Sequence, residues 1–219
     1  RLKELISMTN RYNNYSDFLK SKYGVKVYKL PISIPVTCPN RDGACGFSGC
    51  TFCGDIGAGY QHMPATVSVK EQIDMHTEHI VEKYKAKKFI AYFQNYSNTY
   101  LPLADLEKFV LQACEKDVVR IALATRPDCI NDAYLEKLAE IKNKKMVDIS
   151  IELGLQTVNY HILKEINRGH SLAEYLDAMQ RINRFGLDSC THVILNLPGS
   201  DRLDVIETAK VLSAMKTTE

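Results

Sequence analysis

The sequence predicts an α/β fold, in which helices cover a parallel β-sheet. Short runs rich in Val, Ile and Leu alternate with longer amphipathic stretches, which is the pattern of repeated βα units. The amphipathic stretches begin at recognisable helix caps, and polar residues gather where the apolar runs end. A barrel and an open doubly wound sheet both satisfy this pattern, and both place an active site at the carboxyl ends of the strands.

Five runs have the composition of β-strands. They are residues 25–34, 89–94, 118–125, 147–153 and 191–197. The last four contain many Val, Ile and Leu residues, as strands buried on both faces do.

Four helices are predicted between these strands from their first residues. Ser68 and Ser171 each stand three residues before a glutamate, which is the spacing of a capping box. Pro102 is suited to open another helix, and Asn131 to cap a fourth. The helix that begins at Ser171 is expected to end before Gly186.

The composition is that of a globular protein able to bury a sizeable core. The chain has 219 residues, of which 45% are hydrophobic and 25% charged, and no linker divides it. No run approaches the roughly 18 apolar residues of a membrane helix, and no signal peptide pattern is present. Four of the seven cysteines fall within sixteen positions, which suits a metal centre in a reducing compartment. We expect a cytoplasmic location and no membrane partner.

The N-terminal region is basic. Residues 1–30 carry seven Lys and Arg against two acidic residues, with tyrosines at positions 12, 15, 23 and 28. Cations and aromatic rings together can bind nucleic acid, but a solvated basic helix explains the same charge. We predict a basic helical segment over residues 1–24 and one catalytic core over residues 25–219, with tRNA contact by the segment left open.

A cysteine-rich loop follows the first predicted strand. Cys38, Cys50 and Cys53 stand in a glycine-rich stretch that can fold back on itself, so the three thiols can share one soft metal site. Cys45 is a fourth thiol in the loop and an alternative ligand to Cys38. Two classes of protein therefore stay open: an enzyme whose metal centre uses three thiolates, and an interaction module with a closed four-thiolate zinc site.

Polar residues follow four of the predicted strands, on the side where the cysteine loop emerges. They are Gln94-Asn95, Thr125-Arg126, Glu152 to Gln156 and Asn196 to Gly199. One such cluster is an ordinary βα turn, but four beside a metal loop indicate a functional face.

Seven motifs resemble those of the radical S-adenosyl-L-methionine (SAM) enzymes, in a bacterial branch that is similar to the Elongator catalytic subunit. The motifs are Cys-Pro-Asn-Arg-Asp-Gly, Gly-Cys-Thr-Phe-Cys, Phe-Gln-x-Tyr-x-Asn-Thr-Tyr, Thr-Arg-Pro-Asp-Cys, Glu-Leu-Gly-Leu-Gln, Asn-Arg-Gly-His and His-Val-Ile-Leu-x-Leu-Pro-Gly. The resemblance spans about residues 9 to 215 and implies a partial parallel (β/α) barrel of the radical SAM type. About five of the usual six βα units are present, so we expect a core that is truncated at its C-terminus.

The resemblance also implies the cofactors. Cys38, Cys50 and Cys53 would hold a four-iron four-sulfur (4Fe-4S) cluster, whose open iron binds SAM and whose electron cleaves SAM to a 5'-deoxyadenosyl radical. The residues expected near SAM are Phe52, Gln94, Asn95, Thr125, Arg126, Glu152, Gln156 and Arg168. Many relatives have a Gly-Gly-Glu-like turn where this chain has Gln94-Asn95-Tyr96. Glu152 is also a candidate to pair with Arg168 or Arg126.

The implied partners are a one-electron donor such as flavodoxin or ferredoxin and, by similarity to the Elongator subunit, a tRNA wobble uridine. A small metabolite or a protein is the alternative substrate. Acetyl transfer is not carried over, because no acetyltransferase-like region follows in this sequence.

The remaining histidines and cysteines fit packing roles better than catalytic ones. His76 and His79 are expected to be exposed or partly packed, and Cys114, Cys129 and Cys190 to be small core residues. His170 and His192 lie within the motifs, and contact with substrate and a loop hydrogen bond are both open for them.

Overall fold

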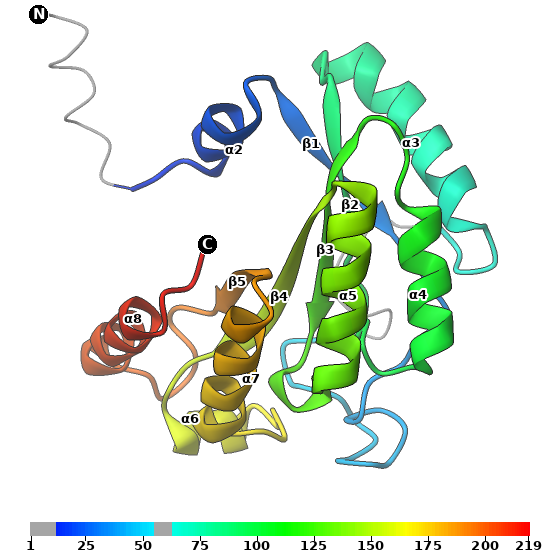
Figure 1. The fold of residues 1–219 in the computed structure, drawn as a ribbon. Helices are drawn as coiled ribbons and strands as arrows, with labels where there is room; N and C mark the ends of the chain where they lie inside the picture. The colour runs from blue at the N-terminus through cyan, green and yellow to red at the C-terminus, as the bar shows by residue number, and fades with distance from the viewer. Residues whose placement is uncertain (1–11, 55–62) are drawn as a thin grey trace, which may run out of the picture.

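The computed structural model describes residues 12–54 and 63–219. Five parallel strands form one sheet in the order β1-β2-β3-β4-β5 (Figure 1). The strands are β1 (Val27–Ile32), β2 (Lys88–Phe93), β3 (Val118–Thr125), β4 (Asp148–Gln156) and β5 (Asp188–Val193). Among the described residues β1 does not pair with β5, so the sheet is an open, partial barrel of five βα units, as expected.

Helices connect successive strands, and four of them lie along one side of the sheet (Figure 1). These four are α3 (Val69–Tyr84), α4 (Leu103–Gln112), α5 (Asp132–Lys145) and α7 (Leu172–Arg184). The other helices are α2 (Tyr15–Tyr23), the 3-10 turn η1 (Pro127–Cys129), α6 (Tyr160–Glu165) and α8 (Arg202–Met215).

The predicted helix starts are confirmed. Ser68 and Ser171 both form capping boxes, and the Asn131 side chain accepts a hydrogen bond from the Tyr134 backbone N–H. Pro102 is the N-cap of α4, and Gly186 follows α7 with a φ of 66°. Local side-chain chemistry therefore decides where these helices begin.

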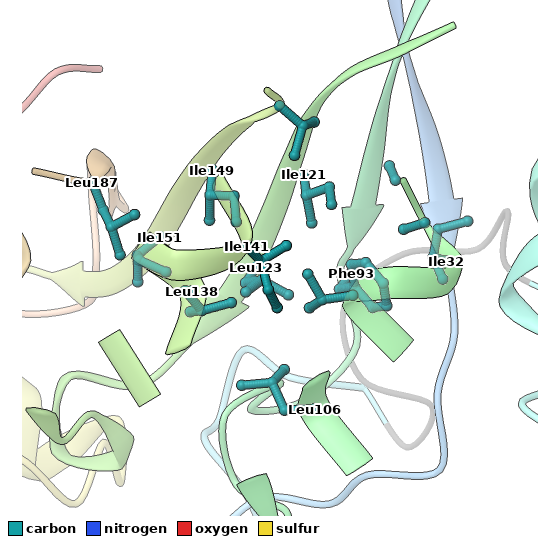
Figure 2. Packing of buried hydrophobic residues seen from close by; sticks show 14 of the residues in the cluster. Ile32, Phe93, Leu106, Ile121, Leu123, Leu138, Ile141, Ile149, Ile151 and Leu187 are labelled. Atoms are coloured by element: carbon teal, nitrogen blue, oxygen red, sulfur yellow. The ribbon is translucent and has the colours of Figure 1, made fainter. Parts of the chain in front are cut away.

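The hydrophobic core lies between the sheet and the four covering helices. Ile121 and Leu123 of β3 and Ile149 and Ile151 of β4 are each 0% exposed and point toward α4 and α5 (Figure 2). Each such side chain contributes about 1.5–3 kcal/mol on burial.

The opposite face of the sheet, the inner face, is polar. Residues that alternate with the core side chains point to it because successive side chains of a strand face opposite ways. Its members include Lys29, Tyr92, Arg120, Glu152 and His192. Burial on both faces is confirmed for β4, but the second face of the sheet is lined largely by hydrogen-bonding groups.

Helix α2 covers the amino-terminal end of the inner face. Leu19 packs against Val27 and Ile90, and the Tyr23 hydroxyl donates to Asp148 Oδ2 at 2.7 Å. Helix α2 ends at Gly24, its left-handed C-cap, and the division into a segment over residues 1–24 and a core over residues 25–219 stays a prediction. The part of the basic segment before Tyr12 lies outside the described residues.

The prediction for the last strand was wrong in its bounds. β5 runs from Asp188 to Val193, because its polar first half pairs with β4 in the register Ser150↔Asp188 and Glu152↔Cys190. The apolar residues that follow leave the sheet: Ile194 and Leu197 pack against α6 instead. An apolar run that packs on a short helix has the same composition as a buried strand.

Candidate active site

Hydrogen bonds from Asn40 hold the cysteine loop at the carboxyl ends of the strands. Asn40, which is 0% exposed, donates from Nδ2 to the backbone carbonyls of Asn167 at 2.6 Å and Arg168 at 3.2 Å. The same Nδ2 lies 3.3 Å from Cys50 Sγ. The Cys53 N–H donates to the Cys50 carbonyl at 3.0 Å, which closes a tight turn between two of the thiols.

The three predicted ligands Cys38, Cys50 and Cys53 line one pocket, which holds about 710 Å³ of space open to solvent. The other lining residues are Asn40, Arg41, Gly49, Phe52, Tyr92, Gln94, Tyr96, Ser97, Ala124, Thr125, Arg126, Glu152, Gly154, Gln156, Arg168 and His192. The pocket therefore unites the loop with the carboxyl ends of β2, β3, β4 and β5.

Every residue predicted for the site lines this pocket except Asn95. Asn95 is 6% exposed, and its Nδ2 lies 3.4 Å from Ser33 Oγ. Its neighbour Gln94 faces the pocket, and adjacent residues in extended backbone point to opposite sides. Asn95 does not line this pocket, and its contact with SAM stays a prediction.

Two arginines approach the thiols. Arg168 Nη1 lies 3.6 Å from Cys50 Sγ, and Arg126 Nη1 lies 4.0 Å from Cys38 Sγ. Arg126 is held by Asp128 through hydrogen bonds of 2.9 and 2.7 Å. Burial opposes the charge on Arg126, but Asp128 outweighs it and raises the pKa of the guanidinium. Donors and positive charge near sulfur ligands tune an iron–sulfur cluster, so the surroundings of these thiols fit one.

A buried ion network stands across the pocket from the thiols. Glu152 Oε1 accepts from Lys29 Nζ at 2.8 Å, and Oε2 lies 2.8 Å from His192 Nε2. The Glu152 side chain is 1% exposed and the His192 side chain 44%. Burial would raise the pKa of Glu152, but His192 and Lys29 outweigh burial and lower it. The expected pairing of Glu152 with Arg168 or Arg126 is wrong, because the register of β4 points its carboxylate along the inner face.

Two pocket residues other than glycine have left-handed backbone. Tyr96 has a φ of 59° after β2, and Gln156 a φ of 74° beside a β-bulge at the end of β4. Such conformations cost of order 1–3 kcal/mol each and cluster at functional sites. Here they re-aim side chains at the points where strands end.

Sequence reasoning missed several lining residues. Tyr92 precedes Gln94 by two positions on an extended segment, so alternation alone could have placed it on the same face. Tyr96 and Ser97 lie inside a quoted motif but were not singled out, and Ser97 Oγ lies 3.7 Å from Cys38 Sγ. Asn40 had no signal beyond its motif, because its role depends on contact with residue 167.

The histidines and cysteines outside the cysteine loop differ in burial and in contacts. His76 is partly buried and His79 exposed, as expected. The ring nitrogens of His170 lie 3.1 Å from the carbonyl oxygens of Gly154 and Ser171, and the neutral imidazole can donate a hydrogen bond to one of them. His192 lines the pocket. Burial raises the pKa of Cys129 to about 12, so this thiol is inert as expected.

Cys190 departs from the expectation of a simple core residue. It faces the inner side of β5, with its Sγ within 4.8 Å of ligand atoms of Glu152 and His192. Burial, followed by the Glu152 charge, raises the pKa of this thiol to about 12. It is therefore a neutral neighbour of the ion network.

The loop sulfurs do not stand in a closed four-thiolate arrangement in this structure. Zinc–sulfur bonds of about 2.3 Å place tetrahedral thiolates ~3.8 Å apart. All four loop cysteines are described, and no three of their sulfur atoms lie within 4.8 Å of one another. Cys45 is exposed and does not line the pocket.

An open parallel (β/α) barrel with three thiols at the carboxyl ends of its strands defines a class of cluster-bearing enzymes. The chain belongs to the radical SAM superfamily, whose family model matches residues 32–212. Uncharacterized protein YtqA of Bacillus subtilis is 37% identical over 204 residues, covering 93% of this chain and 63% of the relative. The chain thus spans less than two thirds of that relative's length. A tRNA uridine(34) acetyltransferase of Methanocaldococcus jannaschii is 28% identical over 90 residues, covering 41% of this chain and 16% of the relative.

Solved structures share the fold. Elp3 of the archaeon Methanocaldococcus infernus, with an N-terminal deletion, aligns with a TM-score of 0.58 at 18% identity, over 85% of this chain and 42% of Elp3. Coproporphyrinogen III oxidase (HemN) of Escherichia coli, a radical SAM enzyme, aligns with a TM-score of 0.55 at 16% identity, over 97% of this chain and 50% of HemN.

Membership of this superfamily confirms the expected class, an enzyme whose cofactors are a 4Fe-4S cluster and SAM. Across residues 12–54 and 63–219, no helix has the length and hydrophobicity that crossing a bilayer requires.

Proposed function

We propose that this chain is the catalytic core of a radical SAM enzyme that modifies a uridine at the wobble position of tRNA. The observation that carries the enzymatic part is the meeting of three loop thiols with polar side chains from four strand ends in one pocket. The tRNA part rests on similarity to a tRNA uridine(34) acetyltransferase and on the Elp3-like fold.

In this proposal Cys38, Cys50 and Cys53 hold the cluster. When bound, the cluster and SAM together supply a 5'-deoxyadenosyl radical. Asn40 and the two arginines hold the thiols by hydrogen bonds and charge. The donor of the required electron is a flavodoxin or a ferredoxin.

The strand-end side chains hold SAM around the thiols. Arg126 and Arg168 supply positive charge for the SAM carboxylate. Phe52, between two of the thiols in the sequence, lines the pocket and would contact the adenine. The remaining polar contacts come from Gln94, Thr125 and Gln156.

Glu152 has a different role in the proposal. Both of its carboxylate oxygens are engaged, by Lys29 and His192, so it orients His192 toward the pocket instead of touching SAM. The half-exposed imidazole is then the protein group best placed to exchange a proton with the substrate. Cys45 is not a cluster ligand in this proposal.

The test is anaerobic reconstitution with iron and sulfide, followed by incubation with SAM, dithionite and total tRNA. We expect 5'-deoxyadenosine together with a changed uridine in digested tRNA, and neither product from a Cys50→Ala variant. Formation of 5'-deoxyadenosine without any change in tRNA, combined with unchanged tRNA nucleosides in a deletion strain, would exclude the tRNA substrate. A metabolite or protein substrate would then be sought.

A further inference from the structure

A second groove runs along β1 beneath α2 and adjoins the thiol pocket. It holds about 1290 Å³ of space open to solvent. Its lining residues are Tyr15, Ser16, Leu19, Lys26, Val27, Tyr28, Lys29, Pro31, Tyr92 and Gln94. Tyr92 and Gln94 line both cavities, so the groove meets the pocket at these two side chains.

The lining of this groove has one sign of charge. Lys26 and Lys29 are its charged residues, and no carboxylate lines it. Three tyrosines add aromatic surface, of which Tyr15 is 37% exposed. Cations with exposed aromatic rings bind ligands that are both anionic and flat, and a nucleotide has both properties.

Lys29 stands where the groove meets the thiol pocket. Its Nζ lies 4.2 Å from the centroid of the Tyr92 ring and 5.2 Å from that of Tyr15. The same Nζ is 2.8 Å from Oε1 of Glu152, which lines the thiol pocket. Lys29 therefore contacts both Tyr15 of α2 and Glu152 of the thiol pocket, and a ligand bound in the groove would lie against it.

We propose that this groove binds a single-stranded RNA nucleotide next to the target base, which then reaches the thiol pocket past Tyr92 and Gln94. The proposal rests on the proposed function and adds to it a substrate-binding surface. A single strand is required because a stacked duplex does not offer its base faces to aromatic side chains. Tyr15 supplies stacking surface and Lys26 faces phosphate.

The test measures binding of a fluorescent anticodon stem-loop RNA to the full chain by anisotropy. We expect Tyr15→Ala to weaken binding about 5- to 100-fold, and Tyr15→Phe to bind like wild type, because stacking needs only the ring. Lys26→Gln should lower the slope of log affinity against log salt by about 0.7. The matched controls are Tyr160→Ala, at a tyrosine 62% exposed on α6, and Lys144→Gln on α5.

Crosslinking avoids any effect of substitution on folding. With 4-thiouridine beside the wobble position, wild-type protein should crosslink within the peptides that carry Tyr15, Lys26 or Tyr92. If the RNA binds but the groove variants match wild type and the crosslinks map elsewhere, the groove proposal is overturned and the proposed function stands. A wild-type chain that neither binds the RNA nor modifies tRNA overturns both.

Discussion

The carbonyl oxygen of Gly154 accepts two hydrogen bonds from Arg168, from Nε at 3.1 Å and from Nη2 at 2.6 Å. A Cβ at position 154 would stand 2.5 Å from Arg168 Nη2 and 2.7 Å from Gln156 Nε2. Because Gly154 has no side chain, Arg168 and Gln156, two residues proposed to contact SAM, have room to lie in the pocket.

Gly154→Ala should weaken SAM binding without unfolding the protein. The Cβ would displace the buried Arg168 guanidinium and weaken its hydrogen bonds to the Gly154 carbonyl, so we expect the free energy of unfolding to fall by about 1–3 kcal/mol, which leaves the protein folded. Displacing Arg168 and Gln156 should lower SAM affinity at least about tenfold, equal to about 1.4 kcal/mol. Isothermal titration of the reconstituted protein with SAM, beside a urea melt, measures both.

Gly186→Ala is the matched control. Gly186 has a φ of 66° with no atom near the new Cβ, so alanine there costs about 1 kcal/mol of stability by backbone strain alone and leaves SAM affinity unchanged. Equal SAM affinity for both variants would show that the Gly154 contacts do not shape the cofactor site.

Arg120→Met should destabilise the protein by about 3 kcal/mol. The Arg120 side chain is 1% exposed, donates to Asp188 Oδ2 at 2.8 Å and pairs with Glu219, whose side chain is 8% exposed. Methionine would remove the cation that pairs with Glu219, while Asp188 would keep Lys22 at 2.8 Å. Arg184→Met removes a partner of exposed Asp132 and should cost less than about 1 kcal/mol in the same urea melts. Equal losses would contradict a structural role for the buried network.

Lowering the pH should destabilise the protein through His170. Burial, followed by the charge of Arg168, lowers the pKa of His170 to about 4, whereas an unfolded histidine titrates near 6.5. Between these values the unfolded state binds the proton and the folded state does not. The stabilisation is therefore complete above pH 6.5 and falls as the pH drops toward 4, by about 2 kcal/mol between pH 7 and 5.

His170→Gln should remove this part of the pH dependence. The measurement is the difference in unfolding free energy between wild type and variant at pH 7 and pH 5, which isolates His170 from the other histidines. A difference that does not change with pH would show that His170 is as easily protonated in the folded state as in the unfolded one.

Glu152→Gln should separate SAM binding from substrate turnover. The variant loses both ion pairs, to Lys29 and His192, so we expect tRNA modification to fall at least about tenfold while SAM affinity stays within about threefold of wild type. His192→Gln should behave in the same way. A large loss of SAM affinity in Glu152→Gln alone would instead make Glu152 a SAM contact.

The fold was predictable where its signals are local. Capping residues such as Ser68 and Ser171 act on backbone groups two or three positions away, so the sequence pattern alone places them. The pocket was predictable because parallel strands end at one edge, which brings Gln94, Arg126 and Gln156 together.

The contacts that could not be predicted depend on how segments distant in the sequence align with one another. Glu152 meets His192 because β4 and β5 pair Glu152 with Cys190, and nothing within either strand fixes that alignment. The motif also could not tell which of the adjacent side chains Gln94 and Asn95 faces the pocket, and in the structure Gln94 does. The bounds of β5 were misjudged because Ile194 and Leu197 find their apolar partners on α6.

The most direct test of the central claim is the iron and sulfide content of single cysteine variants after anaerobic reconstitution. We expect about four iron and four sulfide per chain in wild type and Cys45→Ala, and no stable cluster in Cys38→Ala, Cys50→Ala or Cys53→Ala. A full cluster in Cys38→Ala together with its loss in Cys45→Ala would contradict the assignment of the three thiols that line the pocket.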